Sequence, residues 1–302
     1  MVDRVMRRIG EVRAWGRAWT ERERIRFPWF DHILRTVQRY RVQAGDRLAG
    51  AFTYFAFLSF FPVIALAFAL FGYFVTIRPD ALATLTKAIN SQLPGLAGQL
   101  HIEQLAGARA QAGLIGLLGL LYAGLGAIDS LRGALRTMWM TSEPPLNFFI
   151  GKLRDLVALV LMGLAMLVSV IVSGFATGAT SMVAGWLGLG SSPLAGFGVR
   201  LAGIAASLAA DVLLFLVILG WLAKPPQSFR VVLKGAVLGA VGFAVLKQLA
   251  AVILSHTLHN PVYGTFAVVV GLLLWINLSA RVILFAAAWT ATATLGPPPG
   301  PT

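Results

Sequence analysis

Residues 48–77 read LAGAFTYFAFLSFFPVIALAFALFGYFVTI and contain no Asp, Glu, Lys or Arg. A helix needs roughly 20 apolar residues to cross about 30 Å of hydrocarbon, so this run is long enough to span a membrane. Three more uncharged runs follow, at Ala110–Ile128, Leu156–Val199 and Gln248–Ala280. The whole chain is 58% hydrophobic and 12% charged, whereas an ordinary soluble domain carries about 25% charged residues. The sequence therefore predicts an all-α, polytopic integral membrane protein.

The apolar runs and the charged stretches between them predict six transmembrane helices. These are expected near Ala49–Val75, Ala112–Ile128, Leu156–Thr177, Leu201–Leu222, Val231–Ser255 and Thr265–Thr290. The second is short and could extend into Asp129–Met140. Three regions result: a basic amphipathic segment over residues 1–47, the transmembrane domain over 48–295, and a Pro-Gly-rich, disordered tail over 296–302.

The basic residues are distributed unevenly along the chain. Of the 25 Lys and Arg, 12 lie before Leu48. With the loops after the second and fourth spans, one side carries 19 basic residues against four on the other, which places both termini in the cytoplasm. The net charge of +13 then indicates this orientation and contact with anionic lipid, not nucleic acid.

Aromatic residues interleave with arginine in the N-terminal segment, at Trp15, Trp19 and Trp29 among others. This mixture predicts a helix at the headgroup level that binds anionic headgroups. The alternative is a solvated cytoplasmic helix or a partly disordered arm. Pro28 is expected to divide the segment into two pieces.

Three charged residues interrupt the predicted spans: Asp211, Lys247 and Arg281. A charge in hydrocarbon costs roughly 2.5–3.5 kcal/mol or more, so each is expected to be paired or to face water. Depths counted along the helices favour a pair between Asp211 and Arg281, with Lys247 marginally within reach of Asp211. Asp46, at the inner end of the first span, is a rival partner for Arg281. These residues form either a polar path with a headgroup site or a structural ion pair that fixes helix register.

Pro62 and the glycines bear on how the spans pack. A proline inside a membrane helix frees a carbonyl and kinks the helix, which can line a cavity or be a tolerated irregularity. GxxxG pairs occur at Gly174/Gly178 and Gly235/Gly239, and glycines recur every three residues from Gly113 to Gly119. Such positions permit close helix packing. We expect contacts within the chain, with a homo-oligomer face as the alternative.

Residues typical of covalent or metal chemistry are sparse. The chain has no cysteine, which excludes disulfides and thiolate sites. The pair His256/His259 has no acidic third ligand nearby in sequence, so hydrogen bonding is favoured over metal binding. His101 and Glu103 form another weak pair. No Walker A, HExxH or GxSxG motif occurs. We therefore expect no catalytic residues, no cofactor and no metal.

The first span and the residues around it resemble the opening motif of the YihY/virulence factor BrkB family, including its YhjD-like branch. The motif is GDRLAGAFTYFAFLSFFPVIAL over residues 45–66. The resemblance covers roughly residues 35–295. The matching residues are Asp46, Ala49, Tyr54, Ser59, Pro62, Leu131, Arg132, Leu135, Trp139, Pro225, Arg230, Gly235, Ala236, Tyr263, Gly264 and Trp275.

The resemblance implies a six-helix protein of the bacterial inner membrane. Members were once mislabelled ribonuclease BN, and others are linked to serum resistance or lipopolysaccharide export, but no reaction is established across the family. The last helix departs from the family pattern, because Ala286–Trp289 stands where Gly-Ala-Glu is common. The sequence thus favours a transporter or handler of a lipid or other amphiphile. The alternative is a non-catalytic envelope-assembly or scaffolding protein.

Overall fold

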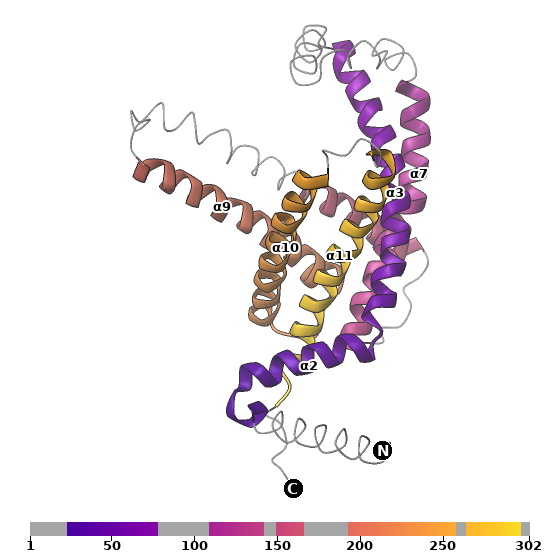
Figure 1. Ribbon diagram of the computed structural model, residues 1–302. Helices are drawn as coiled ribbons and strands as arrows, with labels where there is room; N and C mark the ends of the chain where they lie inside the picture. The colour runs from indigo at the N-terminus through magenta and orange to yellow at the C-terminus, as the bar shows by residue number, and fades with distance from the viewer. Residues whose placement is uncertain (1–22, 78–108, 142–148, 166–192, 258–263, 297–302) are drawn as a thin grey trace, which may run out of the picture.

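The computed structural model describes residues 23–77, 109–141, 149–165, 193–257 and 264–296. In these ranges the regular structure is entirely helical (Figure 1). The named helices are α2 (Pro28–Val42), α3 (Gly45–Ile77), α7 (Arg109–Trp139), α9 (Pro193–Leu216), the π-helix η1 (Val217–Leu222), α10 (Phe229–Thr257) and α11 (Gly264–Thr292). Residues 149–165 form a further helix.

Five stretches of these helices are long and apolar enough to cross a membrane, so the chain is a multi-pass membrane protein. They are Gly45–Ala67, Ala110–Trp139, Gly203–Leu222, Phe229–Ala250 and Val269–Thr292. Five of the six predicted spans correspond to them. The predicted third span, 156–177, begins in the helix of residues 149–165 and then leaves the part of the chain that the structure describes. The second span does extend past Ile128, because α7 continues unbroken to Trp139.

Long neighbouring helices make up the body of the molecule. Helices α3 and α7 lie side by side along most of their length, and α11 packs against α3, α7 and α10 (Figure 1). Helix α9 runs obliquely to α10 and α11, and η1 continues it. Helix α2 lies across the end of the bundle where α11 finishes, and it packs on α11.

Helix α2 begins and ends where local chemistry dictates. Pro28 occupies its first turn, a position where the missing N–H has no intrahelical partner to lose. Residues 23–26 are also helical and Phe27 interrupts the helix, so the described part of the N-terminal segment is divided next to Pro28, as expected. After α2, Ala44 has a positive φ of 52° and α3 begins at Gly45. A Cβ on Gly45 would collide with the Tyr40 ring. The turn therefore needs glycine there, and it brings the end of α2 against the start of α3.

Glycines on α7 let it approach α3 closely. A Cβ on Gly116 would lie 2.9 Å from the backbone nitrogen of Leu66, and one on Gly119 would lie 2.8 Å from the Pro62 ring. Gly113 similarly faces Ala69. Helix α3 continues through Pro62 without a break, and the proline ring fits the notch that these glycines leave. These glycines therefore contact another span of the same chain, as expected.

Gly235 and Gly239 on α10 also allow close packing between spans of the chain. Gly235 faces Thr290 of α11, and Gly239 faces the Phe215 ring of α9. The predicted pair Gly174/Gly178 lies outside the residues that the structure describes. Helix α10 thus packs closely on α9 and α11 at these two glycines. The close contact with α9 brings Lys247 of α10 near Asp211 of α9.

Candidate functional site

Asp211 of α9 and Lys247 of α10 form an ion pair inside the spans, which we call the central pair. Lys247 Nζ lies 2.5 Å from Asp211 Oδ2. The Asp211 side chain is only 2% exposed, whereas that of Lys247 is 34% exposed. A carboxylate so deeply buried is costly without a counter-charge, and Lys247 provides it.

An aromatic ring lies beside the lysine of the central pair, and two further rings pack on that ring. Lys247 Nζ lies 5.3 Å from the centroid of the Phe243 ring, within the range of a cation–π interaction. The Phe243 ring in turn lies 5.6 Å from Trp275 of α11 and 6.2 Å from Phe215 of α9. Rings from three helices therefore meet at Phe243, the residue over which the Lys247 ammonium group lies.

The predicted pair between Asp211 and Arg281 is wrong. Asp211 pairs with Lys247, and Arg281 pairs with Asp46, the rival that the sequence had offered. Residue counts along two helices give comparable depths only if both helices are similarly inclined. Because α9 runs obliquely to α11 (Figure 1), the count along α9 misjudged which cation lies level with Asp211.

A second polar group lies nearer the end of the bundle that α2 covers. We call it the inner cluster, and it consists of Tyr40, Asp46, Thr53, Asn277 and Arg281. Arg281 Nη1 lies 3.2 Å from Asp46 Oδ1, and Arg281 Nε donates to Asn277 Oδ1 at 2.9 Å. Asn277 Nδ2 donates to Thr53 Oγ1 at 3.1 Å. Tyr40 donates its hydroxyl proton to Asp46 at 2.9 Å. A continuous chain of hydrogen bonds thus joins α2, α3 and α11.

The charged side chains of the inner cluster are exposed, while its tyrosine is buried. The side chains of Arg281 and Asp46 are 43% and 65% exposed. Tyr40 is buried, with its ring stacked on Phe285 at 4.0 Å and 7°. Burial and the adjacent Asp46 carboxylate raise the pKa of Tyr40, with Arg281 opposing them. Tyr40 therefore remains a proton donor that orients Asp46, while the guanidinium stays accessible.

A further charged group joins α7 to the helix of residues 149–165. Arg132 pairs with Asp155 and also with Asp129, the latter at 2.5 Å. Asp155 is almost fully enclosed, and burial raises its pKa against the opposing effect of Arg132. Arg132 also belongs to the family-like connector after the second span. Here the ion pairs fix two neighbouring helices, and Leu131, Leu135 and Trp139 on the same stretch are buried in the core.

Sequence reasoning identified the charges of both groups but missed Tyr40, Thr53 and Asn277. The available signal was spacing: Asn277 precedes Arg281 by four residues, and Thr53 follows Asp46 by seven, so each neutral residue shares a helix face with a charge.

The family-like residue Ser59 lies outside both groups and donates to the carbonyl of Phe55. Tyr54 is exposed. The stretch Ala286–Trp289 packs Ala286, Ala287 and Ala288 into the core, leaving no site for an acid there.

The arrangement is suited to binding a charged group. In the ranges that the structure covers, no three His, Asp or Glu side chains converge as metal ligands. His259, His101 and Glu103 lie outside those ranges, and the side chain of His256 is not among those that the structure describes. An exposed guanidinium beside amide and hydroxyl groups, as at Arg281, is typical of carboxylate or phosphate recognition.

Comparison with known proteins places these features in a family. The family model for virulence factor BrkB matches residues 36–297. The inner membrane protein YhjD of Escherichia coli (strain K12) is 31% identical over 277 residues, covering 89% of this chain and 82% of that protein. An uncharacterized protein of Dickeya dadantii (strain 3937) is 31% identical over 296 residues, covering 95% and 88%.

More distant relatives carry only a general name. A UPF0761 membrane protein of Pseudoalteromonas atlantica is 26% identical over 251 residues, covering 80% of this chain and 79% of the relative. No solved structure is significantly similar to the chain.

Proposed function

The chain belongs to the virulence factor BrkB family, and from that premise we propose that it moves an anionic amphiphile, such as a lipid, along a polar path in its bundle. The observation that carries this proposal is the exposure of Arg281. This arginine lies inside a span, yet its side chain is 43% exposed beside an even more open Asp46. Ionisable residues within spans often mark ligand or ion pathways, and other protein groups leave 43% of this side chain uncovered.

The path would run from the inner cluster toward the central pair. Arg281 lies 11 residues from the end of α11, or about 16 Å at 1.5 Å per residue. Lys247 lies 18 residues into α10, or about 27 Å from its start. Between them, Asn277 and Trp275 of α11 offer an amide and a ring close to Phe243. Alternating polar and aromatic groups suit a ligand with a charged head and an apolar tail.

The membrane topology belongs to the same proposal. The helix of residues 149–165 supports a third span over 156–177, which would make six spans with both termini in the cytoplasm. Twelve basic residues before Leu48 support this orientation. Helix α2 would lie at the headgroup level, because its exposed Trp29, Ile33 and Val37 recur every four residues and form an apolar stripe.

Transport by purified protein in vesicles tests the proposal. Anionic phospholipid with a fluorescent acyl chain is placed in proteoliposomes, and its exchange between leaflets is followed by quenching from outside. The protein should accelerate exchange well above protein-free vesicles, and Arg281→Gln should slow it at least fivefold. Arg230→Gln, an exposed arginine at the start of α10, is the matched control and should leave the rate unchanged.

The competing function is a non-catalytic scaffold that assembles with partners or with copies of itself. The wide exposed apolar surface of the spans is compatible with helix partners as well as with lipid. A scaffold has no need of an accessible Arg281. Vesicles in which wild-type protein gives no exchange above the protein-free level would therefore contradict transport and favour this alternative. Neither function involves nucleic acid or a cofactor.

A further inference from the structure

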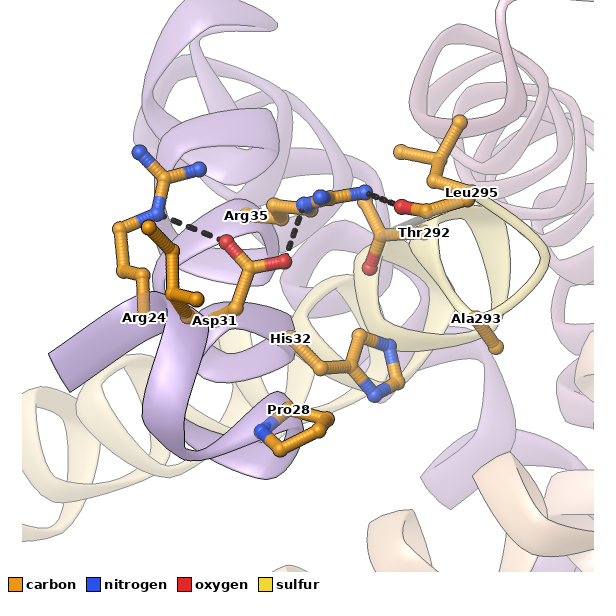
Figure 2. A pocket seen from close by; sticks show the side chains of 10 residues that line it. Arg24, Pro28, Asp31, His32, Arg35, Thr292, Ala293 and Leu295 are labelled. Carbon is orange, nitrogen blue, oxygen red and sulfur yellow. Dashed lines mark hydrogen bonds and ion pairs between the residues drawn. The ribbon is translucent and has the colours of Figure 1, made fainter. Parts of the chain in front are cut away.

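A cavity of about 380 Å³ lies between α2 and the end of α11 (Figure 2). It is separate from both the central pair and the inner cluster. Its polar lining comes from Arg24, Asp31, His32 and Arg35 on one side and from Thr292 on the other, with Ile25 among its apolar residues. Pockets that bind small ligands usually measure about 300–1,000 Å³, so this one is large enough for a small polar group.

A buried acid holds the two arginines of this cavity in place. Asp31 is 4% exposed, and each of its oxygens takes one guanidinium nitrogen: Arg24 Nε at 2.7 Å and Arg35 Nε at 2.6 Å. Two fixed cations thus share one anion, which leaves a net positive charge at the cavity. Organising arginines in advance lowers the entropic cost of binding an anion.

The two arginines use their remaining donors differently. Arg35 also donates from Nη1 to the carbonyl of Gly296 at 2.6 Å, beyond the end of α11. His32 contacts the carbonyl of Trp289 at 3.0 Å through Nε2. Both residues therefore tie α2 to α11. Arg24 turns its two terminal nitrogens away from Asp31 (Figure 2). A guanidinium has five N–H donors, so Arg24 retains the donors needed to grip an oxyanion.

The surroundings of the cavity favour a lipid as the source of that oxyanion. The apolar stripe of Trp29, Ile33 and Val37 is exposed on the same helix, and Ile25 at the cavity is exposed as well. A soluble phosphate gains nothing from this surface, whereas acyl chains can lie along it. Basic pockets at the cytoplasmic ends of spans are typical sites for anionic headgroups.

We propose that this cavity binds the phosphate of an anionic phospholipid, with Arg24 as the principal donor. Because its walls come from α2 with the turn just before it, and from the end of α11 with the residues just after it, a bound lipid would fasten α2 to the bundle. The site does not depend on the proposed transport, because it shares no residue with the polar path. Lipid binding here and lipid exchange in vesicles can therefore fail independently.

Binding to the full chain in detergent tests the site. Short-chain phosphatidylglycerol is the probe, and short-chain phosphatidylcholine and inorganic phosphate are the comparison ligands. Native mass spectrometry counts bound molecules as the concentration rises. We expect one preferred phosphatidylglycerol per chain, and Arg24→Gln should weaken it by on the order of tenfold, as expected for the loss of a charge-assisted hydrogen bond. Arg24→Lys, which keeps the charge but not the planar fork, should give an intermediate loss.

Arg26→Gln is the matched control. Arg26 has the same charge two residues away, is exposed, lies over the Phe27 ring and does not line the cavity. An equal loss in Arg26→Gln and Arg24→Gln would overturn the site, because it would indicate general surface attraction. Equal binding of phosphatidylcholine would also overturn it. Inorganic phosphate binding as tightly as the lipid, with the same dependence on Arg24, would overturn the lipid assignment in favour of a soluble ligand.

Discussion

The central pair and the inner cluster each set an acid against a base inside the spans, but their surroundings differ. Asp211 is 2% exposed, so its carboxylate depends on Lys247 for stabilisation. Asp46 is 65% exposed and shares its charge with Arg281 and the Tyr40 hydroxyl. Both groups contain an ion pair, so the pair alone does not distinguish them. The difference is the burial of the acid, which is high where the pair joins helices and low where the pair is accessible. We therefore assign helix attachment to the central pair and ligand contact to the inner cluster.

The largest effect is expected for Lys247→Met, which preserves length but removes the charge. It leaves the Asp211 carboxylate buried without a counter-charge, a loss of about 3–5 kcal/mol in the free energy of unfolding. Denaturant titration in detergent measures it. Lys234→Met on the same helix is the control, because Lys234 is exposed. Equal small losses in the two variants would mean that the central pair does not stabilise the protein.

Adding Asp211→Asn to Lys247→Met should recover more than half of that loss, because the buried charge is then removed along with its partner. Comparing both single variants with the double variant gives the coupling free energy directly. The cycle between Asp211→Asn and Arg281→Gln should instead be additive, since these residues belong to different pairs. Strong coupling between Asp211 and Arg281, with none between Asp211 and Lys247, would reverse the pairing described here.

Asp46→Asn should cost about 1 kcal/mol or less, the usual range for an exposed ion pair. The effect should shrink in about 1 M salt, where charges are screened beyond about 3 Å. The loss caused by Lys247→Met should persist under the same conditions. Unfolding titrations at low and high salt make the comparison. A salt-insensitive loss of several kcal/mol in Asp46→Asn would show that the inner cluster is as enclosed as the central pair.

The smallest effect is expected for Tyr40→Phe, at about 0.5 kcal/mol, because water can replace the hydroxyl at an exposed Asp46. The stack on Phe285 is retained in this variant. Tyr40→Ala serves as the contrast, since it also removes the ring from its buried position and should cost several times more. The same unfolding measurement applies. A loss in Tyr40→Phe as large as in Tyr40→Ala would make the hydroxyl, rather than the ring, the main link between α2 and α3.

Much of the fold could be predicted because each span must carry its own apolar run. The first span was expected at Ala49–Val75, and α3 covers Gly45–Ile77. The described residues also show the N-terminal segment divided next to Pro28, and the glycines of α7 contact α3 within the chain, both as expected. These features depend on residues that are neighbours in the chain or on the small size of a glycine side chain, and both can be read from the sequence.

The pairing of the charges could not be predicted, because it depends on how helices are inclined and rotated. Lys247 pairs with Asp211 where α9 runs obliquely to α10, and its ammonium group lies over the Phe243 ring. The contribution of Asn277 was equally hidden, since an amide in an apolar run signals nothing until its partner Thr53 is known. The cavity at α2 joins residues far apart in the chain, with Asp31 and Thr292 on opposite walls.

The absence of cysteine from the chain permits the most direct test of an accessible site at Arg281. Single cysteines are introduced as Arg281→Cys, as Leu118→Cys on the exposed apolar surface of α7, and as Ala287→Cys in the core. Inside-out vesicles are then treated with a charged, membrane-impermeant thiol reagent, which reacts with thiolate and so requires water. The account predicts rapid labelling of Arg281→Cys and none of the other two. An Arg281→Cys variant as unreactive as Leu118→Cys would contradict the account, because Arg281 would then face lipid or a sealed core.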